Sequence, residues 1–285
     1  MKDKLNFKQE LTAVFGRPVA ENPTQPMVEA AYSHHGLPWR YLTIEVAPAD
    51  LSAAVTGARA MGFCGFNLTI PHKVAVMQYL DEIGESARLI GAVNCVVRDE
   101  DRLVGENTDG KGFLESLRAV RDPQGLSVFV LGAGGAARAI TVELALAGAK
   151  SITIANRSTP RRDELAAHLR GAANTEIHVA EWRDALKVPP ESDVVINATS
   201  IGLYPDVSIP PLDFATIESG MLVADVIPNP PQTGFLERAA ASGCKTIDGL
   251  GMLVNQGKIG IELWTGIDPD VAVMRRSLEE VFRSV

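Results

Sequence analysis

Two ionisable side chains, Lys73 and Asp109, each stand where a helix is expected to begin after a strand or a hairpin. A lysine in a first helical turn is electrostatically unusual, because the positive end of the helix dipole disfavours a cation there. An aspartate at such a position is more often a helix cap than a catalytic group. Position alone leaves two interpretations of Lys73 open, a proton-transfer group and an ordinary solvated lysine.

Neutral polar side chains accompany both residues along the chain. Asn67 and Thr69 stand at the end of the expected strand before Lys73, and Asn94 ends a loop before an expected hairpin. Binding residues collect at the carboxyl ends of strands, so these side chains are candidates for contacting a small polar molecule. His72 is interpreted as structural, and the sequence predicts no metal site.

A glycine-rich turn, Gly132-Ala-Gly134-Gly135-Ala-Ala137, lies between an apolar strand and an alanine-rich helix. Glycines let the chain leave the strand tightly and let the backbone approach a pyrophosphate, while the helix N-terminus offers N–H groups to the anion. A tight turn that binds nothing is the alternative. The strand before the turn, together with the helix and second strand after it, favours dinucleotide binding.

The second strand after this turn ends without the acidic residue that binds the ribose of NAD. Arg157 and Arg161 are present instead, with Asn156 and Ser158 beside them. Guanidinium groups offer paired donors to phosphate oxygens, so the sequence predicts NADP rather than NAD. The same arginines are also compatible with solvated neighbours of a helix cap at Ser158 or Thr159, and both interpretations can hold together.

Apolar runs and helical patterns alternate along the chain, which predicts an α/β fold with parallel sheets covered by helices. Expected strands lie at 11–15, 41–46, 64–68, 92–97, 102–105, 128–131, 151–155, 194–197, 222–226 and 245–247. Expected helices lie at 27–35, 51–61, 111–120, 135–147, 161–169 and 250–283, the last with a break at 266–269. A further helix opens at Pro71 as its first residue. The polar segment 121–125 is the best candidate for a domain linker.

Composition excludes several classes of protein. The chain has 285 residues, 46% hydrophobic and 22% charged, which suits two modest globular domains. Its net charge of -8 argues against nucleic-acid binding. Cys64, Cys95 and Cys244 are dispersed without a CxxC pair, and neither a signal peptide nor a long apolar span is visible. We therefore expect a cytoplasmic protein with no membrane partner.

Six ordered motifs resemble the shikimate dehydrogenase family over most of the chain. They are Asn67-Leu-Thr-Ile-Pro-His-Lys73, Gly91-Ala-Val-Asn94, Asn107-Thr-Asp-Gly-Lys-Gly-Phe113, Gly132-Ala-Gly-Gly-Ala-Ala-Arg138, Asn197-Ala-Thr-Ser-Ile-Gly202 and Asp248-Gly-Leu-Gly-Met-Leu-Val-Asn-Gln-Gly257. The resemblance implies a substrate domain at 1–112, a Rossmann-type NADP-binding domain at 113–248, and C-terminal helices at 249–285 that return to the first domain. An active-site cleft would lie between the two domains.

The resemblance also assigns roles to individual residues. Lys73 and Asp109 would be the catalytic pair. Substrate would be held by Asn22, Thr24, Asn67, Thr69, Asn94 and Gln256. The cofactor would be bound by Gly132, Ala133, Gly134, Gly135, Ala136, Asn156, Arg157, Ser158, Arg161, Thr199, Gly249 and Met252.

Two positions depart from the family pattern. Asn22-Pro-Thr24 stands where the family usually carries Ser-x-Ser-Pro for the substrate carboxylate, and Pro228 replaces a usual tyrosine. The resemblance implies an NADP-dependent oxidoreductase, of the kind found in aromatic amino acid biosynthesis, that interconverts 3-dehydroshikimate and shikimate or a related cyclic hydroxy acid. The two departures lie on the substrate side and favour a shikimate dehydrogenase-like paralogue over the housekeeping biosynthetic enzyme. The alternative is an NADP-binding sensor with vestigial activity. Either a monomer or a homodimer is compatible with the sequence.

Overall fold

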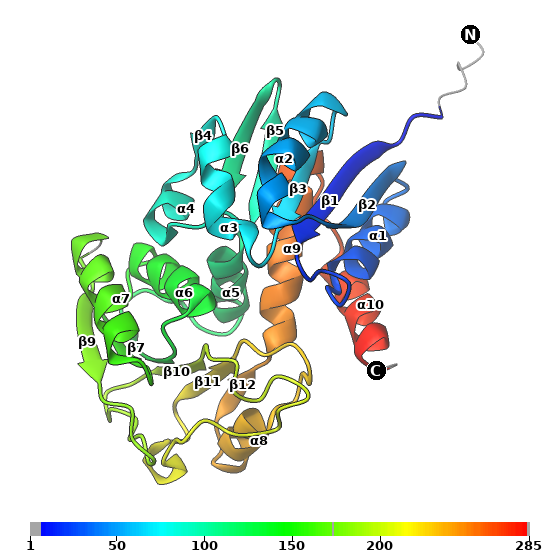
Figure 1. Ribbon diagram of the computed structural model, residues 1–285. Coiled ribbons are helices and arrows are strands. Elements are labelled where there is room, and N and C mark those ends of the chain that lie inside the picture. Colours follow the sequence, from blue (N-terminus) through cyan, green and yellow to red (C-terminus); the bar gives the residue numbers. More distant parts are fainter. Residues whose placement is uncertain (1–6, 173, 284–285) are drawn as a thin grey trace. The chain divides into compact units, whose positions relative to one another are not determined.

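The computed structural model describes residues 7–172 and 174–283, and its internal contacts divide the chain into two compact units (Figure 1). The first unit runs to Thr108 and resumes at Gly257, and the second is Asp109–Gln256. These divisions fall a few residues from the boundaries predicted after 112 and 248, and the roles assigned to the domains stay predictions. Residues 1–6 lie outside the described residues. They begin the N-terminal segment in which the sequence showed no signal peptide.

The first unit is built on a six-stranded mixed sheet with the order β2-β1-β3-β5-β6-β4. The three strands β1, β2 and β3 are parallel, and β5 and β6 form the expected antiparallel hairpin. The strands are β1 (Glu10–Gly16), β2 (Trp39–Glu45), β3 (Gly65–Leu68), β4 (Glu82–Ile83), β5 (Cys95–Asp99) and β6 (Arg102–Glu106). The helices are α1 (Thr24–His34), α2 (Leu51–Ala60), α3 (His72–Ala75), α4 (Glu85–Ile90) and α10 (Val271–Arg283), with 3-10 turns at Pro48–Asp50 and Val76–Tyr79.

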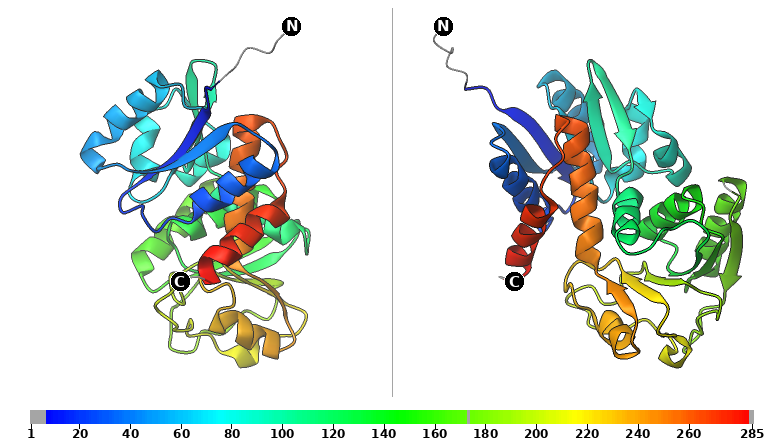
Figure 2. Two further views of the ribbon diagram at one scale, coloured as in Figure 1. Left: turned by 90° about the vertical axis from the view of Figure 1, so that its right-hand side faces the viewer. Right: turned by 180° about the vertical axis from the view of Figure 1, so that it is seen from behind.

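The C-terminal helices complete the core of this first unit. Trp264, in the last turns of α9 (Gly249–Thr265), donates its indole N–H to the Val96 carbonyl at 3.0 Å. A Cβ atom at Gly65 would overlap the same indole ring, so this strand position requires glycine. Helix α10 packs against α1 and buries Met274 and Leu278, which lie one helical turn apart. Figure 2 shows these two helices side by side.

The second unit is a doubly wound sheet of six parallel strands, with the order β12-β11-β10-β7-β8-β9. The strands are β7 (Ser127–Leu131), β8 (Ser151–Ala155), β9 (Glu176–Ala180), β10 (Val194–Asn197), β11 (Leu222–Asp225) and β12 (Lys245–Ile247). The helices are α5 (Asp109–Arg118), α6 (Gly135–Leu146), α7 (Thr159–Ala172), α8 (Gly234–Ala241) and the first half of α9, with a 3-10 turn at Phe214–Thr216. The strand order reverses between β7 and β10, which is the switch point of a Rossmann fold. The predicted fold class is confirmed.

Several local predictions need correction. Helix α5 begins at Asp109 rather than after it, so the carboxylate lies in the first turn and complements the helix dipole instead of capping from outside. Pro71 is the N-cap of α3 rather than its first residue, and α3 has only four residues before a 3-10 turn follows. The segment 121–125 connects α5 and β7 inside the second unit and is not a domain linker.

The sequence patterns did not predict β4, β9 and α8. The edge strand β9 alternates only weakly between buried and exposed positions, and β4 has two residues. The start of α8 could have been predicted, because Thr233 is a favourable N-cap residue and its side chain accepts the Leu236 N–H. No helix within residues 7–172 and 174–283 has the length and apolarity that crossing a membrane requires.

Candidate active site

Buried amides join the ends of β3 and the loop before β5 in the first unit. Asn67 accepts the Tyr41 hydroxyl at 2.7 Å through its side-chain oxygen and donates its amide to the Asn94 carbonyl at 3.0 Å. Asn94 donates its own amide to the Thr108 hydroxyl at 3.0 Å and accepts the Thr108 N–H at 2.7 Å. The sequence suggested Asn67 and Asn94, whereas Tyr41 and Thr108 were missed. Each carries a polar group whose partner is visible only after folding.

Two loops meet at the carboxyl ends of β1 and β3. The Thr69 N–H donates to the Phe15 carbonyl at 3.0 Å, and a Cβ at Gly16 would overlap the Thr69 methyl group. The Arg17 N–H donates to the Ile70 carbonyl at 2.9 Å. The segment that starts at Arg17 is thereby held beside the segment that leads to Lys73.

Lys73 lies in the second position of α3 and is half-buried. Its carbonyl accepts the Val93 N–H at 2.8 Å, which ties the short helix to the loop that carries Asn94. His72 is buried, and its Nε2 lies 2.8 Å from the Val46 carbonyl, so the structural interpretation of this histidine is correct. Lys73 and the polar pair Asn67 and Asn94 therefore belong to one hydrogen-bonded edge of the first sheet.

Asn22 and Thr24 stand between β1 and α1. The side-chain oxygen of Asn22 accepts the Thr24 N–H at 3.0 Å, which closes a local turn. Thr24 is buried at the start of α1. Part of the polar capacity of Asn22 is thus committed to its own loop.

Asp109 and Gln256 belong to the second unit. Helix α5 carries Asp109 and lies tightly against α6 and α9, because Cβ atoms at Gly110 and Gly112 would overlap the backbones of Ala139 and of Met252 and Gln256, respectively. The Asn255 amide donates to the Ser116 hydroxyl at 3.0 Å across the same pair of helices, α5 and α9. Lys73 belongs to the other unit, so the pairing of Lys73 with Asp109 stays a prediction.

The glycine turn has the features required for approach of a pyrophosphate. Gly132 has a φ of 119°, and a Cβ there would lie 2.5 Å from the Ala198 carbonyl oxygen, so this residue must be glycine. Gly134 and Gly135 are exposed, and a Cβ at either would meet open space. The N-cap of α6 is Gly134, which has no side chain, so the N-cap residue leaves the N–H groups of the first turn open to an anion.

Arg157 and Arg161 lie at the end of β8 and in the first turn of α7 and are exposed. Neither forms a side-chain hydrogen bond or ion pair with any residue that the structure describes. No acidic residue occupies the first turn of α7, and two cations at the positive end of a helix dipole are unfavourable without an anion. Asn156 donates to the Ser158 carbonyl at 2.9 Å, which shapes the turn that carries the arginines.

Close backbone approach also defines the start of α9. A Cβ at Gly249 would overlap the backbone of Val226 and Ile227, so α9 begins directly against the loop after β11. Met252 follows on the first turns of the same helix and is half-buried. This loop also contains Pro228.

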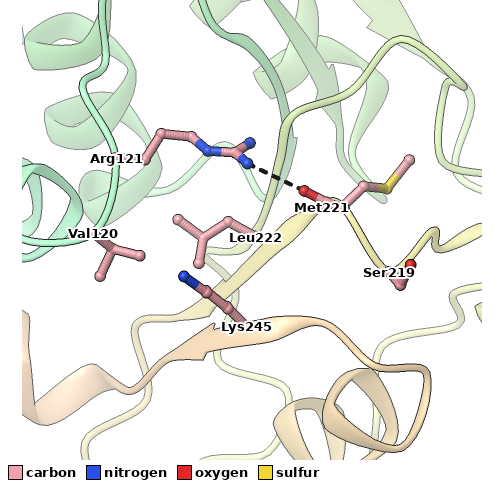
Figure 3. A pocket seen from close by; sticks show the side chains of 7 residues that line it. Val120, Arg121, Ser219, Met221, Leu222 and Lys245 are labelled. Atoms are coloured by element: carbon pink, nitrogen blue, oxygen red, sulfur yellow. Dashed lines mark hydrogen bonds between the residues drawn. The ribbon is translucent and has the colours of Figure 1, made fainter.

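A pocket of about 260 Å³ lies elsewhere in the second unit (Figure 3). Leu222 and Lys245 in its lining are the first residues of β11 and β12, so the pocket lies at the amino ends of these strands. The Arg121 guanidinium donates there to the Gly220 carbonyl at 3.2 Å and to the Asp193 carbonyl at 3.2 Å. The glycine turn follows the carboxyl end of β7, and all six strands are parallel. The pocket therefore lies at the amino ends of the parallel strands, and the candidate cofactor site lies at their carboxyl ends.

Comparison with known proteins covers most of the chain. Residues 14–96 match the model of the shikimate dehydrogenase substrate binding domain, residues 116–204 that of shikimate / quinate 5-dehydrogenase, and residues 249–279 that of the shikimate 5'-dehydrogenase C-terminal domain. The NADP(+) shikimate dehydrogenase of Desulforamulus reducens is 42% identical over 97% of both chains. The chain belongs to the shikimate dehydrogenase family.

Solved structures of this family and its relatives match nearly all of the chain. Shikimate 5-dehydrogenase from Thermus thermophilus, in complex with NADP(H) and shikimate, is 34% identical with a TM-score of 0.82, covering 95% of this chain and 99% of that one. The ligand-free 5-ketofructose reductase of Gluconobacter sp. strain CHM43 is 53% identical with a TM-score of 0.96, covering 97% of this chain and 100% of that one. The family is therefore shown by sequence and by fold together.

Proposed function

We propose that this protein is an NADP-dependent oxidoreductase that interconverts 3-dehydroshikimate and shikimate, or a closely related cyclic hydroxy acid. The observation that carries the proposal is the full-length identity of 42% to an NADP-dependent shikimate dehydrogenase. The enzymes named in the comparisons are dehydrogenases and reductases, and none supports the alternative of a regulatory protein. A place in aromatic amino acid biosynthesis follows from this activity.

The second unit fits NADP. The open space at Gly134 and Gly135 and the uncapped start of α6 suit the pyrophosphate, and Arg157 and Arg161 suit the 2′-phosphate. When bound, the nicotinamide supplies the hydride in one direction and accepts it in the other. The predicted cofactor residues at the glycine turn, at the end of β8 and at Thr199, Gly249 and Met252 all belong to this unit.

Lys73 is proposed to move the proton that accompanies hydride transfer. Its Nζ would donate to the oxygen of the substrate ketone as negative charge develops there, and would accept the proton in the reverse reaction. Asp109 would keep the ammonium charged and oriented. Asn67, Asn94 and Gln256 would hold substrate hydroxyl groups, since an amide both donates and accepts hydrogen bonds.

A neutral polyhydroxylated ketone is the second candidate substrate. The identity to 5-ketofructose reductase, 53%, exceeds the 42% and 34% found for the two shikimate dehydrogenases above. The Asn22–Thr24 segment also departs from the family pattern at the position expected to bind a carboxylate. A substrate without a carboxylate would not need the usual serine pair.

Initial rates of NADPH oxidation with 3-dehydroshikimate and with 5-ketofructose test both candidates in one experiment. The two reverse reactions, oxidation of shikimate and oxidation of fructose by NADP, check each assignment independently. A kcat/KM for 3-dehydroshikimate at least tenfold above that for 5-ketofructose supports the shikimate assignment, and the opposite ratio supports the neutral ketone. Absence of turnover with either substrate contradicts both.

Replacing Asn22 and Thr24 with serine separates the candidates further. A carboxylate remote from the reacting carbon contributes mainly uniform binding, so the double variant should lower the KM for shikimate more than it changes kcat. A hydrogen bond to a charged group is worth about 1.5–3 kcal/mol, or roughly ten- to a hundredfold in affinity. Thr43→Ser, a conservative change on the neighbouring strand β2, is the matched control. We further propose a cytoplasmic enzyme that is a monomer or a homodimer.

A further inference from the structure

The ends of β10 and β11 are joined by a buried polar network that the sequence motifs did not reveal. Asp225, at 1% exposure, accepts the Asn197 amide at 3.0 Å and the Ile227 N–H at 3.1 Å on one carboxylate oxygen. Its other oxygen accepts the Thr233 hydroxyl at 2.7 Å. The groups that contact this carboxylate in the described network are neutral, so hydrogen bonds rather than an ion pair hold it.

The Asn197 side chain also forms hydrogen bonds with the loop that follows β10. Its side-chain oxygen accepts the Thr199 hydroxyl at 2.7 Å and the Thr199 N–H at 3.2 Å. Its amide also donates to the Ile201 carbonyl at 3.2 Å, and the Ile201 N–H donates to the Thr199 hydroxyl at 3.1 Å. Both ends of the Asn197 amide are thus fully used, and the Thr199 hydroxyl is used inside the loop.

The position of this loop follows from the strand order. Arg157 and Arg161 follow β8, so the proposed 2′-phosphate contact would put the adenosine side of the cofactor on the β8 side of the glycine turn. A dinucleotide crosses the switch point between β7 and β10, so its nicotinamide half must lie over β10 and β11. The near contact of Gly132 with the Ala198 carbonyl places the loop directly beside the glycine turn.

We propose that Asp225 is a positioning residue for the nicotinamide half of the cofactor, acting through Asn197 on the loop Ala198–Ile201. The inference rests on the proposed function, because it needs a bound NADP. Asp225 touches neither cofactor nor substrate in this role. It holds the Asn197 amide in the one orientation that leaves its oxygen facing Thr199. The Thr233 contact anchors the same carboxylate to the N-terminus of α8.

Asp225→Asn changes this network while conserving shape. If its new NH2 group takes the position beside Asn197, two donors face each other. If it takes the position beside Thr233, the hydroxyl must turn and accept from it, and the Asn197 contact becomes one between neutral groups. In either orientation Asn197 loses its charge-assisted hydrogen bond to residue 225. Thr233→Val is the matched control, because it removes a contact of the same carboxylate but leaves the Asn197 contact in place.

The test compares the affinity for NADPH with that for 2′,5′-ADP, which carries the adenosine, 2′-phosphate and first phosphate but no nicotinamide. We expect Asp225→Asn to weaken NADPH binding at least fivefold and to lower kcat, with 2′,5′-ADP affinity unchanged within twofold. Thr233→Val should lower Tm but keep the ratio of the two affinities. If Asp225→Asn lowers the affinities for both ligands equally, or leaves the affinity for NADPH unchanged, the proposal is overturned.

Asn197→Ala tests the same link if Asp225→Asn fails to fold. It removes the side chain that joins Asp225 to Thr199 and is not among the predicted cofactor residues, so it should weaken NADPH binding and spare 2′,5′-ADP. Unchanged NADPH binding in this variant counts against the proposal. Failure of the proposed function looks different: the unmutated protein would then bind neither ligand, which overturns both.

Discussion

The Asn67 amide donates to the backbone carbonyl of Asn94 at 3.0 Å and so ties the end of β3 to the loop before β5. Asn67 also accepts the Tyr41 hydroxyl, which leaves one amide hydrogen and one lone pair of its side chain for other partners. A side chain held at both ends is preorganised. A substrate hydroxyl that used the remaining capacity would meet a donor or acceptor already fixed in place.

Lys73→Ala should abolish most turnover and leave NADPH affinity unchanged, because the ammonium is proposed to act on the substrate oxygen and not on the dinucleotide. Removal of a general acid costs about 10²–10⁴ in rate. Steady-state kcat and a fluorescence titration with NADPH measure the two effects separately. The control is Lys111→Ala, in the first turn of α5. A Lys73→Ala variant with near-normal kcat would show that the residue is not the proton donor.

Arg157 and Arg161 should determine the preference for NADP over NAD. Replacing both with alanine removes donors to the 2′-phosphate, and each such contact is worth about 1.5–3 kcal/mol when it is shielded from water. The ratio of kcat/KM for NADP to that for NAD should fall tenfold or more, with the NAD value little changed. Arg170→Ala, at the other end of α7, serves as the control. Equal affinities for the two cofactors in the unmutated protein would rule out this role.

Gly134→Ala should separate folding from cofactor binding. Gly134 has a φ of −88°, and a Cβ there would meet nothing within 4 Å, so the variant should keep its Tm. The added methyl group would stand where the pyrophosphate approaches, and loss of one charge-assisted contact lowers affinity about ten- to a hundredfold. Gly171→Ala, at an open position in α7, should leave NADPH binding intact and gain up to about 1 kcal/mol in stability. Unaltered NADPH affinity in Gly134→Ala would place the pyrophosphate elsewhere.

Cys64 should react slowly with alkylating reagents below pH 10. Partial burial raises the pKa of its thiol to about 11, and the Glu10 carboxylate, which accepts the thiol hydrogen at 3.5 Å, adds to the effect. At pH 8 only about one thiol in a thousand would be the reactive thiolate. Mass spectrometry of the alkylated Cys64 peptide should show a rate that climbs until pH approaches 11. Glu10→Gln should lower the pKa and speed the reaction at pH 8, whereas a rate that levels off near pH 8.5 would contradict the assigned environment.

Local patterns were sufficient for the parts of the fold that backbone sterics and residue periodicity control. The strands 194–197 and 245–247 were predicted with the bounds that the structure has. The glycine turn was recognised from its place between strand and helix, and the two arginines from their position after β8. The helix starts at Pro71 and Asp109 were less certain, because a shift of one or two residues changes little in the local pattern.

The roles of Lys73 and Asp109 came from ordered motifs, since helix and strand patterns do not distinguish a catalytic lysine from a solvated one. Only the tertiary structure paired Asn197 with Asp225, which lie 28 residues apart, and brought the backbone of Ile227 against Gly249. It also decided that α10 packs against α1. Such contacts depend on the order of strands and on the space that packed neighbours leave, and a buried carboxylate acquires its hydrogen-bond partners only when distant segments meet.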